Sequence, residues 1–251
     1  MPTSVSQVIK AALSYVPDRI RYRSRWLQVR MRSYWGVDQL TQAKFERVSV
    51  FTDADKMSLE EKEVKWEEVT REHMRLILSR VPYDAEWRVL DLGCAVGRML
   101  LPMSGVFREL VGVDISPKMI DHSRSYLAGI KNVSTMVGSG FDLRPLENGS
   151  FDMVYSIYTF QHFPRIQLVE NYLKEINRVL RPGGWLALQT CTGEDNPWRW
   201  FKRIVVADFG GVGFSPQALT DLVESTDFDV ASTLLSAPAV WVFAPKKSHG
   251  Q

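Results

Sequence analysis

The 251-residue chain has the length of one large domain, or of one domain with an appended segment. Its 45% hydrophobic and 24% charged residues are typical of a globular protein, and a net charge of +2 excludes bulk attraction to nucleic acid or membranes. Cys94 and Cys191 form no CxxC pair, which argues against a structural zinc site or a disulfide scaffold and favours a reducing compartment. Lys10 and Pro17 interrupt the first apolar stretch, and no apolar run reaches about 18 residues. We therefore expect neither a signal peptide nor a spanning helix, and a cytoplasmic location.

A change of composition near residue 85 predicts a helical N-terminal extension, residues 1–85, before a second part, residues 86–251. Basic residues dominate residues 1–50, and between Arg19 and Arg32 they alternate with apolar and polar side chains. This spacing does not form one helical face. Two interpretations remain open: a solvated basic tail, or an arm or lid that binds an anionic acceptor or an anionic membrane surface.

A long helix is predicted to lead into the first strand. Ser58 is a suitable N-cap, and Glu61 stands at the spacing of a capping box. A rough apolar stripe follows, made of Val64, Val69, Met74, Leu76 and Leu78. The pattern predicts one helix that continues to Arg80.

Short apolar runs then alternate with helical patterns. Strands are predicted at 88–92, 110–114, 133–137, 151–156, 185–190, 229–235 and 240–244. Helices are predicted from the turn after the first strand to about Phe107, and at 117–127, 166–180 and 216–225. Right-handed crossovers make this order a doubly wound α/β fold with a seven-stranded, mostly parallel sheet covered on both faces.

The strongest local signal is the segment 89–97, in which an apolar strand ends at an acid and a glycine turn opens a helix. Gly93 and Gly97 lack Cβ atoms, so a ligand can approach the backbone closely. Asp91 stands where the pyrophosphate of a dinucleotide would lie, and therefore favours a cationic ligand with an amino group. Asp114 ends the second strand, where a carboxylate can accept two ribose hydroxyls. A strand-to-helix turn without a ligand is the simpler alternative.

Four stretches together resemble the class I S-adenosylmethionine-dependent methyltransferase family: VLDLGCAVGRM, GVDIS, NGSFDMVYSIYTFQHF and RVLRPGGWLALQ. The resemblance covers roughly residues 87–245 and implies a Rossmann-like fold with S-adenosylmethionine as cofactor. It implies cofactor contacts at Asp91, Gly93, Cys94, Ala95, Gly97, Asp114, Ile115, Met119, Ser139, Gly140, Phe141, Ser156 and Ile157. The sequence departs from the commonest pattern at Ala95, where glycine is usual, and at Asp142, which does not stand at the usual adenine-contacting place.

On the acceptor side, His162 follows the fourth strand, and a histidine there can take a proton from an acceptor hydroxyl. Tyr158 flanks the same turn and is a second candidate catalytic residue, or a wall of the pocket. Polar and aromatic side chains after the fifth strand either line an acceptor pocket or form a hydrophobic cluster under a loop. These are Glu194, Asp195, Trp198, Trp200 and the glycine-rich segment 209–214.

The resemblance implies direct in-line methyl transfer to a small acceptor, a sugar, lipid or secondary metabolite, with O-methylation favoured. Cys191 lacks the Pro-Cys setting of cytosine C5 methylation, and no Asn-Pro-Pro-Tyr motif is present, so nucleic acid ranks lower as a partner. The alternatives are an RNA or protein methyltransferase that uses the basic arm, and a non-catalytic cofactor-binding module. The sequence predicts no metal ligand set and leaves the oligomeric state open.

Overall fold

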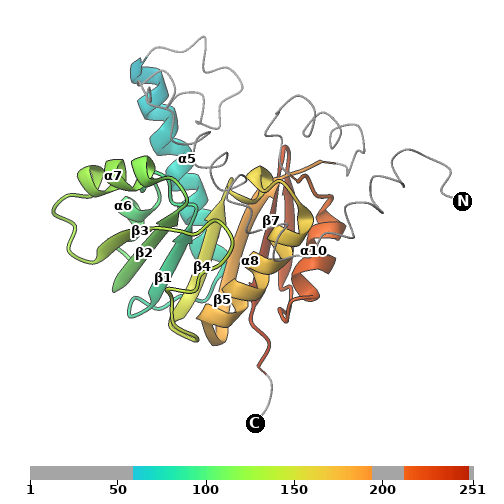
Figure 1. Ribbon diagram of the computed structural model, residues 1–251. Helices are drawn as coiled ribbons and strands as arrows, with labels where there is room; N and C mark the ends of the chain where they lie inside the picture. The colour runs from blue at the N-terminus through green and yellow to red at the C-terminus, as the bar shows by residue number, and fades with distance from the viewer. Residues whose placement is uncertain (1–58, 194–211, 249–251) are drawn as a thin grey trace, which may run out of the picture.

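The computed structural model describes residues 59–193 and 212–248, and its centre is a seven-stranded sheet (Figure 1). The strands are β1 Arg88–Leu92, β2 Glu109–Asp114, β3 Val133–Val137, β4 Phe151–Ile157, β5 Leu180–Cys191, β6 Ser232–Ser236 and β7 Ala239–Pro245. They are ordered β3-β2-β1-β4-β5-β7-β6, and β7 alone pairs antiparallel with both of its neighbours. The predicted fold class, a mostly parallel seven-stranded sheet, is confirmed.

Helices cover both faces of this sheet (Figure 1). They are α5 Leu59–Arg80, α6 Leu100–Met103, α7 Pro117–Tyr126, α8 Ile166–Val179 and α10 Pro216–Glu224, with a 3-10 turn, η2, at Phe160–His162. Two helices begin with a serine cap followed by proline: Ser116 accepts from the Met119 amide, and Ser215 accepts from the Ala218 amide. Within the described ranges, no helix is both long enough and apolar enough to cross a membrane.

Successive side chains of each strand point to opposite faces of the sheet, and a hydrophobic core forms on each face. In β1, Val89 packs into a core with Ile77 of α5, whereas Leu90 packs into a core with Leu173 of α8. Helices α5, α6 and α7 contribute to the first core, and α8 and α10 contribute to the second. Strands buried on both faces are what a sheet with helices on both sides requires.

Three predicted elements differ from the structure by more than one residue at an end. The helix after β1 does not reach Phe107: α6 has only four residues, because residues 93–99 form turns and Pro102 and Gly105 follow closely. Strand β5 begins at Leu180 rather than residue 185, and its register with β4 shifts between Phe151 and Met153. Strand β6 begins at Ser232 rather than residue 229.

The prediction of helix α5 is confirmed in extent, and the proposed apolar stripe is confirmed only in part: Met74, Leu76 and Leu78 are partly buried against the first core. Val64 is 53% exposed, whereas Thr70 and Ile77 are buried. The buried side of α5 has helical spacing, and His73 lies on it between Thr70 and Ile77. The predicted N-cap Ser58 and the basic segment 1–50 lie outside the described residues. The boundary near residue 85 stays a prediction.

Candidate functional site

Most of the predicted site residues lie at one edge of the sheet. Strands β1 to β5 are parallel, so their carboxyl ends meet at the same edge. Asp91 lies near the end of β1 and Asp114 ends β2, while Ser156 and Ile157 end β4. The Ser156 hydroxyl donates to the Leu92 carbonyl at 2.7 Å and so ties the ends of β4 and β1 together.

The loop after β1, residues 93–99, is bound to the end of β2. The amides of Gly93 and Cys94 donate to the Val113 carbonyl at 2.7 and 3.1 Å, and the Ala95 amide donates to Asp114 Oδ2 at 3.0 Å. Ala95 has a φ of 47°, which costs an alanine energy that a glycine would not pay. The departure from the commonest family pattern is therefore accommodated as local backbone strain.

The space beside the two loop glycines is filled by the protein itself. A Cβ atom on Gly93 would lie 2.0 Å from Thr159 Oγ1, and a Cβ on Gly97 would lie 2.7 Å from Leu127 Cδ1. The expectation that a missing Cβ makes room for a ligand does not hold on these sides. The glycines allow close packing of neighbouring side chains and supply φ values of 82° and 88°.

Asp91 is a buried acid without an ion-pair partner among the described residues. It is 4% exposed and stands opposite Tyr155 in the pairing of β1 with β4. Burial raises its pKa to about 7, against the opposing influence of Tyr155 and the charge of Arg98, and Asp114 raises it further. The buried Tyr155 hydroxyl faces this carboxyl without reaching hydrogen-bond geometry. A cationic group beside Asp91 would relieve the cost of its charge.

Asp114 joins the loop after β1 to the helix after β2. Its Oδ2 accepts from the Ala95 amide, and its Oδ1 accepts from the Ser116 amide at 2.8 Å. Burial raises the pKa of Asp114 although the amides of Ser116, Ala95 and Ile115 lower it. A carboxylate can accept about four hydrogen bonds, so this one can still accept from a hydroxyl group of a ligand.

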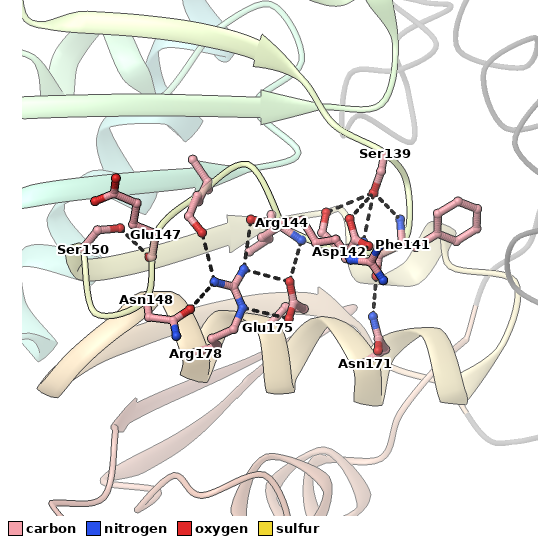
Figure 2. Close-up of polar contacts among 12 residues, drawn as sticks. Ser139, Phe141, Asp142, Arg144, Glu147, Asn148, Ser150, Asn171, Glu175 and Arg178 are labelled. Atoms are coloured by element: carbon pink, nitrogen blue, oxygen red, sulfur yellow. Dashed lines mark hydrogen bonds and ion pairs between the residues drawn. The ribbon is translucent and has the colours of Figure 1, made fainter. Parts of the chain in front are cut away.

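The loop after β3, residues 138–150, lies against Asp114 and Ile115. The Gly138 amide donates to the Asp114 carbonyl at 2.7 Å, and a Cβ on Gly140 would lie 2.5 Å from Ile115 Cδ1. The Ser139 hydroxyl accepts from the amides of Phe141 and Asp142 and donates to Asp142 Oδ1 at 2.9 Å (Figure 2). The predicted adenine loop is thus held beside the predicted ribose acid.

Several predicted contact residues besides Asp91 have buried side chains, Ser156 and Ile157 among them. Met119 is 3% exposed and Phe141 is 8% exposed. Cys94 is buried, and its sulfur would lie 2.8 Å from a Cβ on Gly112, so it faces the sheet. Burial also raises the pKa of the Cys94 thiol, which stays protonated. Any ligand contact of Cys94 is therefore through its backbone.

Helix α5 contributes a group of residues that sequence reasoning missed. Arg98, in the loop after β1, donates to Thr70 Oγ1 at 2.8 Å and meets His73 Nδ1 at 3.3 Å. The His73 ring packs against Tyr158 and Trp241, with centroids 5.6 and 5.4 Å apart. Burial and the charge of Arg98 lower the pKa of His73 to about 3, so its imidazole is neutral. The available signal was the isolated basic residue directly after Gly97.

The two predicted catalytic residues lie just beyond β4. Tyr158 has a φ of 55°, and its amide donates to Gln189 Oε1 at 2.8 Å. Burial raises the pKa of Tyr158, so its phenol stays protonated and can donate a hydrogen bond. His162 ends η2, and burial lowers its pKa to about 4. At neutral pH its imidazole is therefore neutral and is a weak base.

The predicted acceptor wall falls mainly outside the described residues, because Glu194, Asp195, Trp198 and Trp200 belong to the undescribed segment 194–211. The end of that segment is described. Val212 donates through its amide to the Phe163 carbonyl at 3.1 Å, and Phe214 is buried. The chain therefore returns to the sheet edge beside η2.

The sequence matches the family described as "Methyltransferase domain" over residues 90–188. It is 34% identical over 97 residues to a sterol 4-C-methyltransferase of Caenorhabditis elegans, a match that covers 38% of this chain and 28% of that protein. It is 33% identical over 100 residues to a demethylmenaquinone methyltransferase of Staphylococcus aureus, covering 39% of this chain and 40% of that protein. The chain thus spans less than half the length of these two relatives.

Among solved structures, the PH0226 protein of Pyrococcus horikoshii superposes with a TM-score of 0.62 at 21% identity. The match covers 81% of this chain and 99% of that chain. At this identity the likeness concerns the fold, and it extends well beyond residues 90–188, which match the family.

Proposed function

We propose that the chain is a class I S-adenosylmethionine-dependent methyltransferase, which binds this cofactor and transfers its methyl group to a small-molecule acceptor. The match of residues 90–188 to the methyltransferase domain and the named methyltransferase relatives support this proposal. The observation that carries the proposal is the buried Asp91 with a pKa of about 7. The ammonium group of the cofactor would supply the positive charge that this carboxyl lacks.

The other residues of the edge fit the remaining parts of the cofactor. Asp114 would accept the ribose hydroxyls, and Ile115 with the loop at Gly140 would enclose the adenine. Arg98 uses one donor on Thr70 and one on His73, which leaves N–H groups for the methionine carboxylate. The acids and the arginine therefore match the charges of the ligand.

When bound, S-adenosylmethionine supplies an electrophilic methyl group for direct in-line transfer. The residues of this chain would bind and orient the two reactants, which lowers the barrier by holding them at attack distance. Tyr158 and His162 lie where the fourth strand ends and would face the acceptor. Tyr158 would donate a hydrogen bond, and His162 would accept a proton from a hydroxyl.

We favour O-methylation, with C-methylation as the second candidate. The C. elegans relative is named a C-methyltransferase, and this is the observation that favours a carbon acceptor. If the acceptor is a hydroxyl, His162→Ala should lower kcat by about 10²–10⁴-fold with little change in S-adenosylhomocysteine affinity. Because the pKa of His162 is about 4, its protonation should not lower the wild-type rate until the pH approaches that value.

The basic segment before residue 50 stays a candidate arm for an anionic acceptor or a membrane surface. Removal of residues 1–32 should leave cofactor binding intact and should raise the acceptor KM, because the cofactor residues all follow residue 87. Normal turnover of the acceptor by the truncated protein would indicate that the segment is only a solvated tail.

Isothermal titration calorimetry with S-adenosylhomocysteine tests the proposed function directly. We expect binding that NAD does not compete away, because Asp91 opposes a pyrophosphate. A protein that binds NAD and shows no heat with S-adenosylhomocysteine would contradict the proposal. A screen of metabolite and lipid extracts for S-adenosylhomocysteine release would then identify the acceptor and separate an enzyme from a non-catalytic module.

A further inference from the structure

The loop after β3 is fastened to helix α8 by three side chains on one side of that helix (Figure 2). Asn171, Glu175 and Arg178 stand four and three residues apart, a spacing that aligns them along the helix. Residues 138–150 have no helix or strand, so their backbone groups need partners elsewhere. The three side chains bind four of these groups, the carbonyls of Phe141, Leu143 and Leu146 and the amide of Leu143.

Arg178 is the centre of the arrangement. Its Nη2 donates to the Leu143 carbonyl at 3.0 Å and its Nη1 donates to the Leu146 carbonyl at 2.9 Å. Nη1 also donates to Asn148 Oδ1 at 2.6 Å. Nε and Nη2 each donate to Glu175 at 2.9 Å. All five N–H groups of the guanidinium are therefore used, three of them on the loop.

Glu175 and Asn171 complete the attachment. Glu175 Oε2 accepts from the Leu143 amide at 2.8 Å, so the Glu175–Arg178 pair binds both backbone groups of Leu143. The Asn171 side-chain amide donates to the Phe141 carbonyl. Burial alone would raise the pKa of Glu175, but its bonds from Arg178 and Leu143 lower it, so the carboxylate is ionised at neutral pH.

The held segment is the one that adjoins the proposed cofactor site. Phe141 and Leu143 come shortly after Gly138 and Gly140 in the chain. Gly138 bonds to Asp114, and Gly140 packs against Ile115. A shift of the backbone at residues 141–143 would therefore move the surface that faces the adenine. Asn171, Glu175 and Arg178 themselves lie on α8 and contact neither Asp114 nor the loop after β1.

We propose that Glu175 and Arg178 are positioning residues for cofactor binding, an inference that rests on the proposed function. They hold the loop after β3 in the conformation that receives the adenine, and they act through the backbone of Leu143. A loop that is competent for only a fraction of the time lowers the apparent affinity by that fraction. Lysine cannot replace Arg178, because one ammonium group cannot reproduce the planar five-donor fork.

The test compares Arg178→Met, Arg178→Lys and Glu175→Gln with a control, Arg88→Met. Arg88 pairs with Glu109 at 2.9 Å and has similar exposure, but it begins β1 at the opposite edge of the sheet. Affinity is measured by calorimetry for S-adenosylhomocysteine and for S-inosylhomocysteine, in which hypoxanthine replaces adenine. The two ligands differ only in the base, so the ratio of their affinities reports on recognition of the base. A general loss of stability would lower both affinities and leave this ratio unchanged.

We expect Arg178→Met and Glu175→Gln to weaken S-adenosylhomocysteine binding about tenfold, Arg178→Lys to recover only part of the loss, and Arg88→Met to stay within about twofold. The preference for adenine over hypoxanthine should narrow in Arg178→Met and remain in Arg88→Met. A folded Arg178→Met protein with wild-type affinity, or with an unchanged base preference, would overturn the inference.

Failure of the proposed function is seen separately, because the wild type would then bind neither ligand. If Arg178→Met does not fold, Asn171→Ala carries the same test. It removes the uncharged contact to the Phe141 carbonyl and should also narrow the base preference. An unchanged preference in a folded Asn171→Ala protein would likewise overturn the inference.

Discussion

The loop after β1 and the loop after β3 are each held by an arginine, but in opposite electrostatic settings. Arg98 is bound by the neutral side chains Thr70 and His73, and burial lowers its pKa. Arg178 is bound by the carboxylate of Glu175, and that bond raises its pKa. Within the described residues, Arg98 forms no ion pair, although the charge of Asp91 raises its pKa.

This difference separates a ligand-binding loop from a supporting one. At the loop after β1, the buried Asp91 and the partly buried guanidinium of Arg98 do not form an ion pair with each other. A ligand that carries both an ammonium and a carboxylate group would give each of them a partner of opposite charge, the ammonium for Asp91 and the carboxylate for Arg98. At the loop after β3, the charge of Arg178 is already matched, and its donors are used on the backbone. Four experiments test whether this contrast is real.

The largest expected effect is on packing at the two loops. Gly93→Ala and Gly140→Ala impose the same strain, since the φ angles are 82° and 86°. The new Cβ at Gly93 meets Thr159 Oγ1, which is bonded to the Leu92 carbonyl, whereas the Cβ at Gly140 meets the mobile end of Ile115. We expect losses in unfolding free energy of about 3 kcal/mol and about 1 kcal/mol. Urea denaturation measures both, and equal losses would contradict the contrast.

Asp114 contacts the first loop by its side chain and the second by its backbone. Asp114→Ala should weaken S-adenosylhomocysteine binding by about 1.5–3 kcal/mol, the scale of hydrogen bonds to a charged group. Asp114→Asn keeps one acceptor oxygen and should lose less. Calorimetry gives both values, and circular dichroism checks the fold. Unchanged affinity in a folded Asp114→Ala protein would remove this residue from the ribose site.

The two arginines should respond differently to salt. Arg98→Met and Arg178→Met should each cost about 2 kcal/mol of unfolding free energy, because each leaves polar groups without partners. The Arg178 contribution includes a partly exposed ion pair with Glu175, so its cost should shrink in about 1 M NaCl. The Arg98 contribution rests on neutral partners and should persist. If about 1 M NaCl abolished the loss of unfolding free energy in Arg98→Met, the contrast between the two arginines would be contradicted.

Near neutral pH the smallest expected effect is the pH dependence that Asp91 gives to cofactor affinity. Its pKa in the free protein is about 7, and a bound ammonium should lower it, so affinity is full above that pH and falls as pH drops through it. The limiting slope is about tenfold per pH unit. Asp91→Asn should abolish the dependence.

The same substitution should have an opposite effect on the free protein. Because the pKa of Asp91 is raised on folding, its carboxyl favours the folded state at low pH, and this advantage is lost as pH rises toward about 7. Asp91→Asn should therefore make the free protein more stable at pH near 8 while it weakens binding. Lower stability at that pH would show that the ionised carboxylate already has a partner.

Local patterns in the sequence determined much of the fold and the position of the site. The apolar runs gave the strands, and the acids at the ends of β1 and β2 with the glycine turn between them located the edge. These features depend on residues that are neighbours in the chain, so periodicity and turn chemistry suffice. The predicted helix after β1 is too long, because Gly93, Ala95 and Gly97 have positive φ angles and form turns instead of helix.

The tertiary structure alone decided which residues hold the loops. Thr70 lies 28 positions before Arg98, and Arg178 lies 35 positions after Leu143. Thr159 fills the space beside Gly93, and its hydroxyl reaches Leu92 across 67 positions. No repeating pattern encodes such pairs, because each depends on how two separate elements pack on the same sheet. Burial, which sets the pKa values of Asp91 and His73, is likewise a property of that packing.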